Sequence, residues 1–478
     1  MAIRRFTNAS LLSCNNLNRI VSLLKKKVII ARSYFTYSQN PNHYPRRQSK
    51  WTSAEEAVSV IKSGDRLYVQ AISSTPRTLV AAMVHHAKAS RLKNLSNYLH
   101  FMYGDVEYLK PEYQDIFHCN VVFVSPNIRE AINTGKAHYV PIFITDIPLF
   151  LHQQPVDVAL VQVSPPDERG FCSLGGCVES TRAAIETAKC VIAQVNSYQI
   201  KTFGDSQVHV NCFDFLVEGH HELPQVQLKQ YSETDLKIGK LLADNLVDDG
   251  STLQTGVGSL PDAILASLNQ HRNLGFHTEM FSDGVVDLFN SGAITNRFKT
   301  VIPRKIVTSF TRGTKKLYDF LNNNVCVEMR DISFTNNTGV IASNHKMVAI
   351  NSCIEIDLAG EVAADCIGSY IYSGFGGQVD FLRGTAESLD RKGKPIIVLH
   401  SRTNKGQAKI VPHLKPGSAV VSTRGHVHYV VTEYGIANLF GKTLRHRAYE
   451  LIRIAHPDDR EKLEKAAFDR FKCMPSPL

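Results

Sequence analysis

The stretch HTEMFSDGVVDL, residues 277–288, places a glutamate, Glu279, after an apolar run and just ahead of a Ser282-Asp283-Gly284 turn. A carboxylate is disfavoured inside a strand by propensity. At the carboxyl end of a strand in an open α/β sheet, however, side chains face the crevice where ligands bind, and a carboxylate there can serve as a nucleophile. The spacing alone does not distinguish that role from a surface glutamate or one paired with arginine.

Two glycine-rich segments could bring the backbone close to a ligand. GVGSLP (256–261) is a turn between an expected strand and helix, where backbone N–H groups can hold a phosphate or oxyanion. Pro261 replaces the third glycine of G-x-G-x-x-G, which argues against a dinucleotide fold. GFGGQVDF (374–381) has three glycines in four residues, so no Cβ atoms would block a close approach. A plain structural turn remains the alternative for each segment.

Other motifs are incomplete. GIANLFGKT (435–443) has five residues between its glycines where a Walker A loop has four, which excludes an NTPase loop. HHELPQ (220–225) lacks the second histidine of a zinc protease, and His426 and His428 have no obvious further ligand. G-x-S-x-G, the serine hydrolase elbow, is absent. We predict no metal site.

Short β-rich runs alternate with helical patterns along both halves, which predicts βαβ units and mainly parallel sheets. In the first half we expect strands at 65–70, 120–125, 157–163 and 190–195, and helices at 76–87 and 179–188. In the second half, Ser232 and Asp235 form a capping box for a helix to Leu246. Strands are expected there at 251–255, 274–280, 347–351, 395–400, 418–423 and 428–433, and helices from Pro261 and over 285–290.

The fold class predicted is therefore α/β, with two similar open α/β domains at 44–225 and 226–478. No apolar run is long enough to span a membrane.

The net charge of +10 lies entirely in residues 1–50, which hold ten Lys or Arg and no acid. Such a start is typical of a mitochondrial transit peptide, which we assign to 1–43, with the matrix as destination. A basic arm that binds nucleic acid is the alternative. The ten cysteines include no C-x-x-C pair, and a matrix location argues against disulfides.

Several blocks together resemble one family. HTEMFSDGVVDL, GVGSLPDAIL, GFGGQVDFLRG, DVALVQVSPPDERGFCSLG and VHYVVTEYGIANLFGKTLRHRA are similar to the acetyl-CoA hydrolase/transferase family, from about residue 50 to 465. The resemblance implies a class I CoA-transferase type fold with acyl-CoA between two α/β domains. It also implies that Glu279 forms a thioester with CoA. The residues that it implies contact CoA are Gly256, Val257, Gly258, Ser259, Leu260, Gly374, Gly376, Gly377 and Lys405.

The resemblance further implies transfer of CoA from acetyl-CoA to succinate by a ping-pong route through Glu279. No permanently bound cofactor is expected, and CoA serves as substrate and covalent intermediate. The expected partners are acyl-CoA and short-chain carboxylic acids, without nucleic acid, and a homodimer is expected from the general frequency of symmetric assemblies. Two alternatives stay open. An acetyl-CoA hydrolase would release CoA without an acceptor acid, and a non-catalytic acyl-CoA binding protein would not need Glu279.

Overall fold

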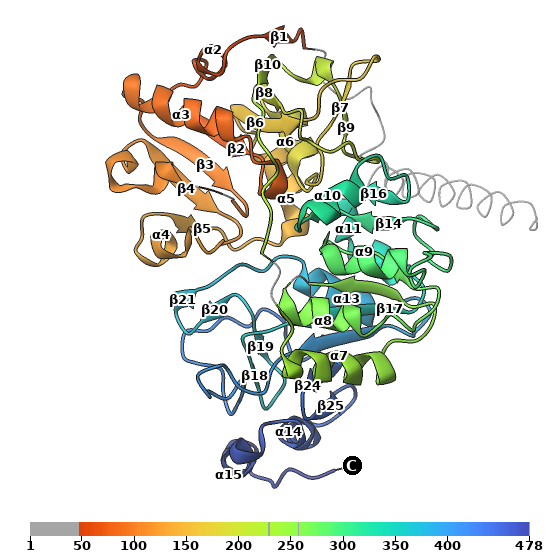
Figure 1. The fold of residues 1–478 in the computed structure, drawn as a ribbon. Coiled ribbons are helices and arrows are strands. Elements are labelled where there is room, and N and C mark those ends of the chain that lie inside the picture. The colour runs from red at the N-terminus through yellow and green to blue at the C-terminus, as the bar shows by residue number, and fades with distance from the viewer. Residues whose placement is uncertain (1–46, 103, 105, 228–229, 257, 478) are drawn as a thin grey trace, which may run out of the picture. The chain divides into compact units, whose positions relative to one another are not determined.

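The first half of the chain forms an open sheet in which every pairing is parallel (Figure 1). The computed structural model describes residues 47–477 other than 103, 105, 228–229 and 257. The strand order is β1-β10-β8-β6-β2-β3-β4-β5. The strands are β1 Lys50–Trp51, β2 Arg66–Val69, β3 Leu95–Leu99, β4 Phe117–Val121, β5 His138–Tyr139, β6 Val158–Val163, β8 Cys190–Val195 and β10 Phe215–Glu218.

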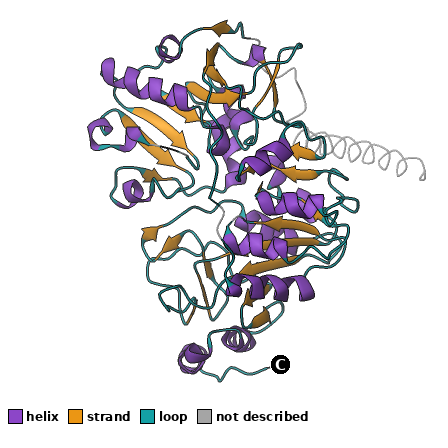
Figure 2. Ribbon diagram, viewed as in Figure 1, coloured by secondary structure: helices purple, strands orange, loops and turns teal. Residues whose placement is uncertain are grey.

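Helices accompany this sheet, as the alternating sequence pattern requires. They are α2 Ala54–Val58, α3 Arg77–Ala89, α4 Arg129–Asn133, α5 Ile147–Gln153 and α6 Thr181–Thr187. Figure 2 shows these helices beside the orange strands. All six residues of β6 and five of the six in β8 are buried, because central strands of a parallel sheet are covered on both faces.

The second half forms a six-stranded sheet in the order β12-β11-β17-β22-β24-β25. Only β24 and β25 pair antiparallel. Its strands are β11 Thr252–Thr255, β12 Gly275–Phe276, β17 Met347–Ser352, β22 Lys394–Val398, β24 Tyr429–Thr432 and β25 Gly435–Asn438. Its helices are α7 Glu233–Asn245, α8 Ser259–Ala266, α9 Asp283–Asn290, α10 Lys315–Leu321, α11 Ile332–Thr335, α12 Thr338–Ala342, α13 Gln378–Ala386, α14 Leu444–Arg453 and α15 Pro457–Phe471.

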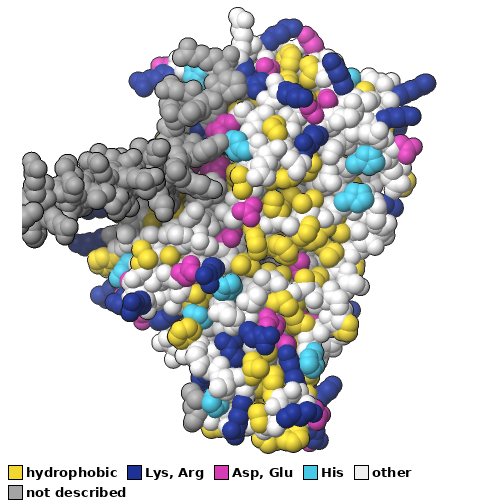
Figure 3. All heavy atoms as spheres, turned by 180° about the vertical axis from the view of Figure 1, so that it is seen from behind, with side chains coloured by type: hydrophobic (Ala, Val, Ile, Leu, Met, Phe, Trp, Pro, Cys, Tyr) yellow, Lys and Arg dark blue, Asp and Glu magenta, His cyan; other side chains and the backbone are white. Residues whose placement is uncertain are grey.

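Short strand pairs lie outside the two large sheets. They are β7 Phe171–Ser173 with β9 Gln207–His209, β13 Met280–Phe281 with β15 Phe310–Thr311, β14 Ile306–Thr308 with β16 Val327–Met329, and β20 Cys366–Ile367 with β21 Tyr370–Ile371. A further three strands, β18 Glu355–Asp357, β19 Val362–Ala363 and β23 Ile410–Val411, form one small sheet. Hydrophobic side chains gather across the middle of the face shown in Figure 3.

The predicted α/β class with mainly parallel sheets is confirmed. The capping box is also present: Asp235 N donates to Ser232 Oγ and Ser232 N to Asp235 Oδ2, at 3.0 Å each. Within the described residues no helix is long and apolar enough to cross a membrane, and the nine cysteines described there are free. The predicted transit segment 1–43 lies outside the described residues. The boundary predicted near 225 falls between β10 and α7 and stays a prediction.

Four element predictions were wrong in detail. The strand expected at 120–125 ends at Val121, because the chain then leaves the sheet and Val124 N donates to Ser373 O at 3.4 Å. The strand expected at 274–280 is interrupted after Phe276, where His277 forms a bridge with Val307. Residues 418–423 form no strand and make only the bridge of Ser422 to Val362. Helix α8 begins at Ser259, two residues before Pro261.

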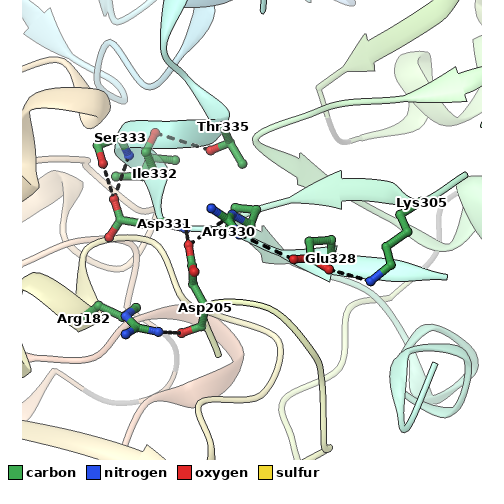
Figure 4. Close-up of polar contacts among 9 residues, drawn as sticks. All are labelled: Arg182, Asp205, Lys305, Glu328, Arg330, Asp331, Ile332, Ser333 and Thr335. Atoms are coloured by element: carbon green, nitrogen blue, oxygen red, sulfur yellow. Dashed lines mark hydrogen bonds and ion pairs between the residues drawn. The ribbon is translucent and has the colours of Figure 1, made fainter. Parts of the chain in front are cut away.

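A buried ionic network joins segments of the two halves (Figure 4). Arg330 Nε lies 3.3 Å from Asp205 Oδ2, and both side chains are at most 5% exposed. Asp331 N donates to the same carboxylate at 2.8 Å, and Asp205 N donates to Met329 O at 2.7 Å. Toward the surface, Glu328 accepts a hydrogen bond from Lys305 Nζ at 2.8 Å. The contacts of Arg330 therefore fix residues 327–331 against the loop that contains Asp205.

Arg330→Met should lower the free energy of unfolding by about 3–5 kcal/mol, because it removes a buried cation from beside the buried Asp205 carboxylate. Lys305→Met is the matched control, since its ammonium group is partly exposed, and we expect less than about 1 kcal/mol. Urea unfolding of both variants checks this. Equal losses for the two variants would show that Arg330 contributes no more than an exposed ion pair.

Candidate active site

Three segments meet at the carboxyl edge of the second sheet. Gly256 directly follows β11, and Glu279 lies three residues beyond the end of the neighbouring strand β12. The glycine cluster 374–377 precedes α13, whose Gln378 Nε2 donates to Ser352 O at the end of β17, at 3.3 Å. Because β12, β11 and β17 are parallel neighbours, their carboxyl ends share one edge, where α/β sheets bind ligands.

The backbone around Glu279 is held by an unusual density of hydrogen bonds. Its carbonyl oxygen accepts from Ser309 N at 3.0 Å, Phe310 N at 3.1 Å and Thr308 Oγ1 at 3.1 Å. Two residues earlier, the buried ring of His277 contacts Thr335 O through Nε2 at 2.9 Å. These hydrogen bonds hold the chain between β12 and β13 in one path, and they therefore fix the direction of the Glu279 side chain.

The Glu279 carboxylate lies against Asn336 and Gly377. Asn336 Nδ2 donates to Glu279 Oε2 at 2.7 Å. A Cβ atom at Gly377 would lie 2.0 Å from that oxygen and 2.1 Å from Asn336 Nδ2, so only glycine fits there. Gly376 has φ +53° and lies beside the other carboxylate oxygen, Oε1, to which its Cβ would be 3.8 Å away. The second glycine-rich segment thus packs directly on the carboxylate.

Burial raises the pKa of Glu279 to about 7. The Asn336 amide and the Gly377 backbone N–H oppose this by hydrogen bonding to the charged form, whereas the nearby Glu179 carboxylate raises the pKa further. Asp380 on α13 accepts from the same Asn336 Nδ2 at 3.3 Å, and burial raises its pKa to about 8. Burial therefore favours the protonated form of both carboxyl groups relative to exposed acids.

A cavity of about 260 Å³ opens beside Glu279. On one side it is lined by residues that follow the ends of the neighbouring strands β2, β3 and β4 of the first sheet, including Ile72, His100 and Phe123. On the other side lie Glu279 and Phe310 from the second half. Its size falls slightly below the usual range for ligand pockets, about 300–1,000 Å³, and suits a short-chain acid better than a large ligand.

The structure places the other candidate residues as follows. Gly258, with φ +130°, is the N-cap of α8, and Ser259 and Leu260 form its first turn. Gly256 precedes them, and Val257 lies outside the described residues. A Cβ at Gly374 would meet Phe123 Cδ2 at 3.0 Å, so this glycine packs on the cavity wall. Lys405 lies exposed in the loop between Arg402 and Ala408, and its one hydrogen bond among the described residues is to Thr403 of that loop.

Three groups beside Glu279 escaped the sequence analysis. Asn336, in FTNNTGV, carries no motif that would mark it. Asp380 stands inside the quoted segment GFGGQVDF, so its carboxylate could have been noticed there. The sequence predicts Glu179 only as the start of a helix, whereas in the structure Glu179 is buried and α6 begins at Thr181.

The fold agrees with comparisons against known proteins. The chain matches the acetyl-CoA hydrolase/transferase N-terminal domain over residues 37–226 and the C-terminal domain of the same family over residues 313–467. The chain belongs to the acetyl-CoA hydrolase/transferase family.

Two relatives and one solved structure are similar to this chain over most of its length. The chain is 48% identical over 474 residues to a succinyl-CoA:acetate/propanoyl-CoA:succinate CoA transferase of Fasciola hepatica, covering 98% of this chain and 99% of that one. It is 45% identical to a 4-hydroxybutyrate coenzyme A transferase of Clostridium kluyveri, covering 89% and 98%. The solved structure of RipA from Yersinia pestis matches with a TM-score of 0.83 and 31% identity, covering 89% and 98%.

The raised pKa of Glu279 makes the free energy of unfolding depend on pH. Between the ordinary value of 4.5 and about 7, the folded chain keeps a proton that the unfolded chain has lost, so stability falls as pH rises through this window. Glu279→Gln removes this titration. From pH 4.5 to pH 8, the variant should gain stability over the native chain by about 1–3 kcal/mol.

Urea unfolding at both pH values measures the difference. Glu387→Gln is the control, because that carboxylate is about half exposed at the surface. The same change with pH in both variants, or no change for Glu279→Gln, would contradict the raised pKa.

Proposed function

We propose that this protein transfers CoA from acetyl-CoA to succinate, giving acetate and succinyl-CoA, through a thioester on Glu279. The observation that carries the proposal is the Glu279 carboxylate itself, desolvated, hydrogen-bonded by Asn336 and placed at the wall of a small, mostly apolar cavity. The name of the Fasciola hepatica relative supports the choice of acids.

In the first half-reaction, a Glu279 oxygen attacks the thioester carbonyl of acetyl-CoA. The C–S bond breaks, and an acetyl-glutamyl anhydride and CoA thiolate result. The thiolate then attacks the glutamyl carbonyl, the C–O bond to acetate breaks, and acetate leaves. Glutamyl-CoA remains on the enzyme, with the thioester conserved and no net proton transferred.

In the second half-reaction, a succinate carboxylate attacks the glutamyl-CoA carbonyl and releases CoA thiolate. The thiolate attacks the succinyl carbonyl of the new anhydride, which yields succinyl-CoA and restores the Glu279 carboxylate. Each step at the glutamyl carbon puts negative charge on its oxygen. The Asn336 amide and the Gly377 N–H already contact the Glu279 carboxylate and can stabilise that charge. CoA is a substrate and covalent intermediate here, and no permanently bound cofactor takes part.

Water is the competing acceptor. Hydrolysis of the glutamyl thioester would turn the same site into an acetyl-CoA hydrolase, the other activity in the name of the family. The apolar cavity walls and the burial of the Glu279 carboxylate favour transfer, because they limit the access of water to the intermediate.

We also propose which residues contact CoA, as the family resemblance implies. They are the loop residues Gly256, Val257, Gly258, Ser259 and Leu260, together with Lys405. A homodimer is proposed on general frequency.

Intact mass after incubation with acetyl-CoA alone tests the intermediate. The native chain should gain the mass of CoA less water, and succinate should discharge the adduct. Glu279→Gln and Glu279→Ala should gain nothing, whereas Glu387→Gln, an exposed control, should behave as native. Steady acetate release without an acceptor acid would favour the hydrolase, and neither adduct nor release would leave an acyl-CoA binding protein.

We further propose that residues 1–43 direct the chain to the mitochondrial matrix. The support is the ten cations and no acids in residues 1–50, with the rest of the chain formally neutral. Residues 1–50 fused to a fluorescent protein should enter mitochondria, and exchange of Arg4, Arg5, Arg19 and Arg32 for glutamine should lower import. A mature chain that keeps these residues and binds RNA would favour the basic-arm alternative.

A further inference from the structure

The cavity beside Glu279 is mostly apolar but carries cations. Its walls include the rings of Phe101, Phe123 and Phe310. Arg129 and Arg312 line it as well, and among the described lining residues Glu279 is the only carboxylate. The two arginines therefore favour a second negative charge in the cavity, and its apolar walls suit the carbon chain of an acid.

His100 is a buried polar group of this cavity whose ring nitrogens lack partners. The side chain is 7% exposed, and within the described residues neither ring nitrogen has a hydrogen-bond partner. The ring stands between Phe123 and Phe310, with centroid distances of 5.7 and 5.9 Å. Burial lowers the pKa of His100, so the imidazole is neutral and offers one N–H donor. An unsatisfied buried donor is costly, which indicates that a ligand group completes it.

The two arginines are anchored by aromatic neighbours. The Arg129 guanidinium lies 3.5 Å from the centre of the Tyr372 ring, and Arg129 Nε donates to Tyr372 O at 2.7 Å. The Arg312 guanidinium lies 5.1 Å from the centre of the Phe101 ring. Stacking of this kind orients a planar guanidinium, whose fork of N–H groups matches a carboxylate.

We propose that His100, Arg129 and Arg312 form a subsite for the distal carboxylate of a dicarboxylic acid substrate. This inference rests on the proposed function, in which the proximal carboxylate of the acid reacts at Glu279. A monocarboxylic acid of the same length would place its methyl group in the subsite, where it offers no anion to the two arginines and no hydrogen-bond acceptor to His100. The subsite thus selects a four-carbon diacid over a four-carbon monoacid.

The test compares succinate with butyrate, which differ only in the distal carboxylate. Enzyme loaded with CoA from acetyl-CoA is mixed with either acid, and discharge of the adduct is followed by intact mass. Arg312→Gln should slow discharge by succinate about 10- to 100-fold, the effect expected for loss of a charge-assisted hydrogen bond, and leave butyrate within about threefold. Arg312→Lys should restore part of the succinate rate. His100→Phe keeps the ring and should slow succinate discharge by about tenfold.

Arg297→Gln is the matched control, because this exposed arginine also lies over an aromatic ring, that of Phe298 at 5.9 Å, outside the cavity. Equal slowing of both acids, or no slowing of either, would overturn the subsite. If Arg312→Gln takes up no CoA, the comparison of succinate with butyrate on Arg129→Gln and His100→Phe tests the subsite instead. Absence of an adduct on the native chain would instead overturn the proposed function, so the two failures are distinct.

Discussion

For the proposed reaction, the carboxylate of Glu279 must be shielded from water and still able to ionise, and much of the described structure serves this constraint. Burial alone would keep it protonated, and exposure would leave it a weak, solvated nucleophile. Hydrogen bonds from the Asn336 amide and the Gly377 N–H favour the ionised carboxylate and oppose the effect of burial, so the pKa is about 7. No side chain can replace Gly377 without displacing the carboxylate, because a Cβ there would lie 2.0 Å from its oxygen.

Such a balance requires that the two halves of the chain be fixed against each other, since the cavity takes walls from both. The Arg330–Asp205 pair and its backbone hydrogen bonds anchor one such contact (Figure 4). Closer to the carboxylate, Phe310 pairs with Cys177, and Val124 donates to Ser373. A shift at this junction would alter the cavity and the desolvation of Glu279 together.

The polar groups of the cavity also bear on the choice between transfer and hydrolysis. In the proposed mechanism, a bound acid whose far end is held in place occupies the space that water would need, and it presents its other carboxylate to the proposed glutamyl thioester. Oriented binding therefore favours the acid over water, although both are nucleophiles. The name of the family includes both transfer and hydrolysis. The difference between an oriented acid and a mobile water molecule can favour one reaction over the other without any change at Glu279.

The sequence by itself determined the α/β class and most strands and helices, because period, capping and turn chemistry are local properties. Glu279 became the candidate nucleophile through the resemblance of whole blocks to one family, since its spacing alone left other roles open. Tertiary structure alone decided that Asn336, 57 residues from Glu279, donates to it, and that Asp380 shares the same amide. It also placed His100 in the cavity and interrupted the strand expected at 274–280, where the chain changes pairing partner. Such contacts depend on which strand ends are neighbours, and no spacing within one segment encodes that.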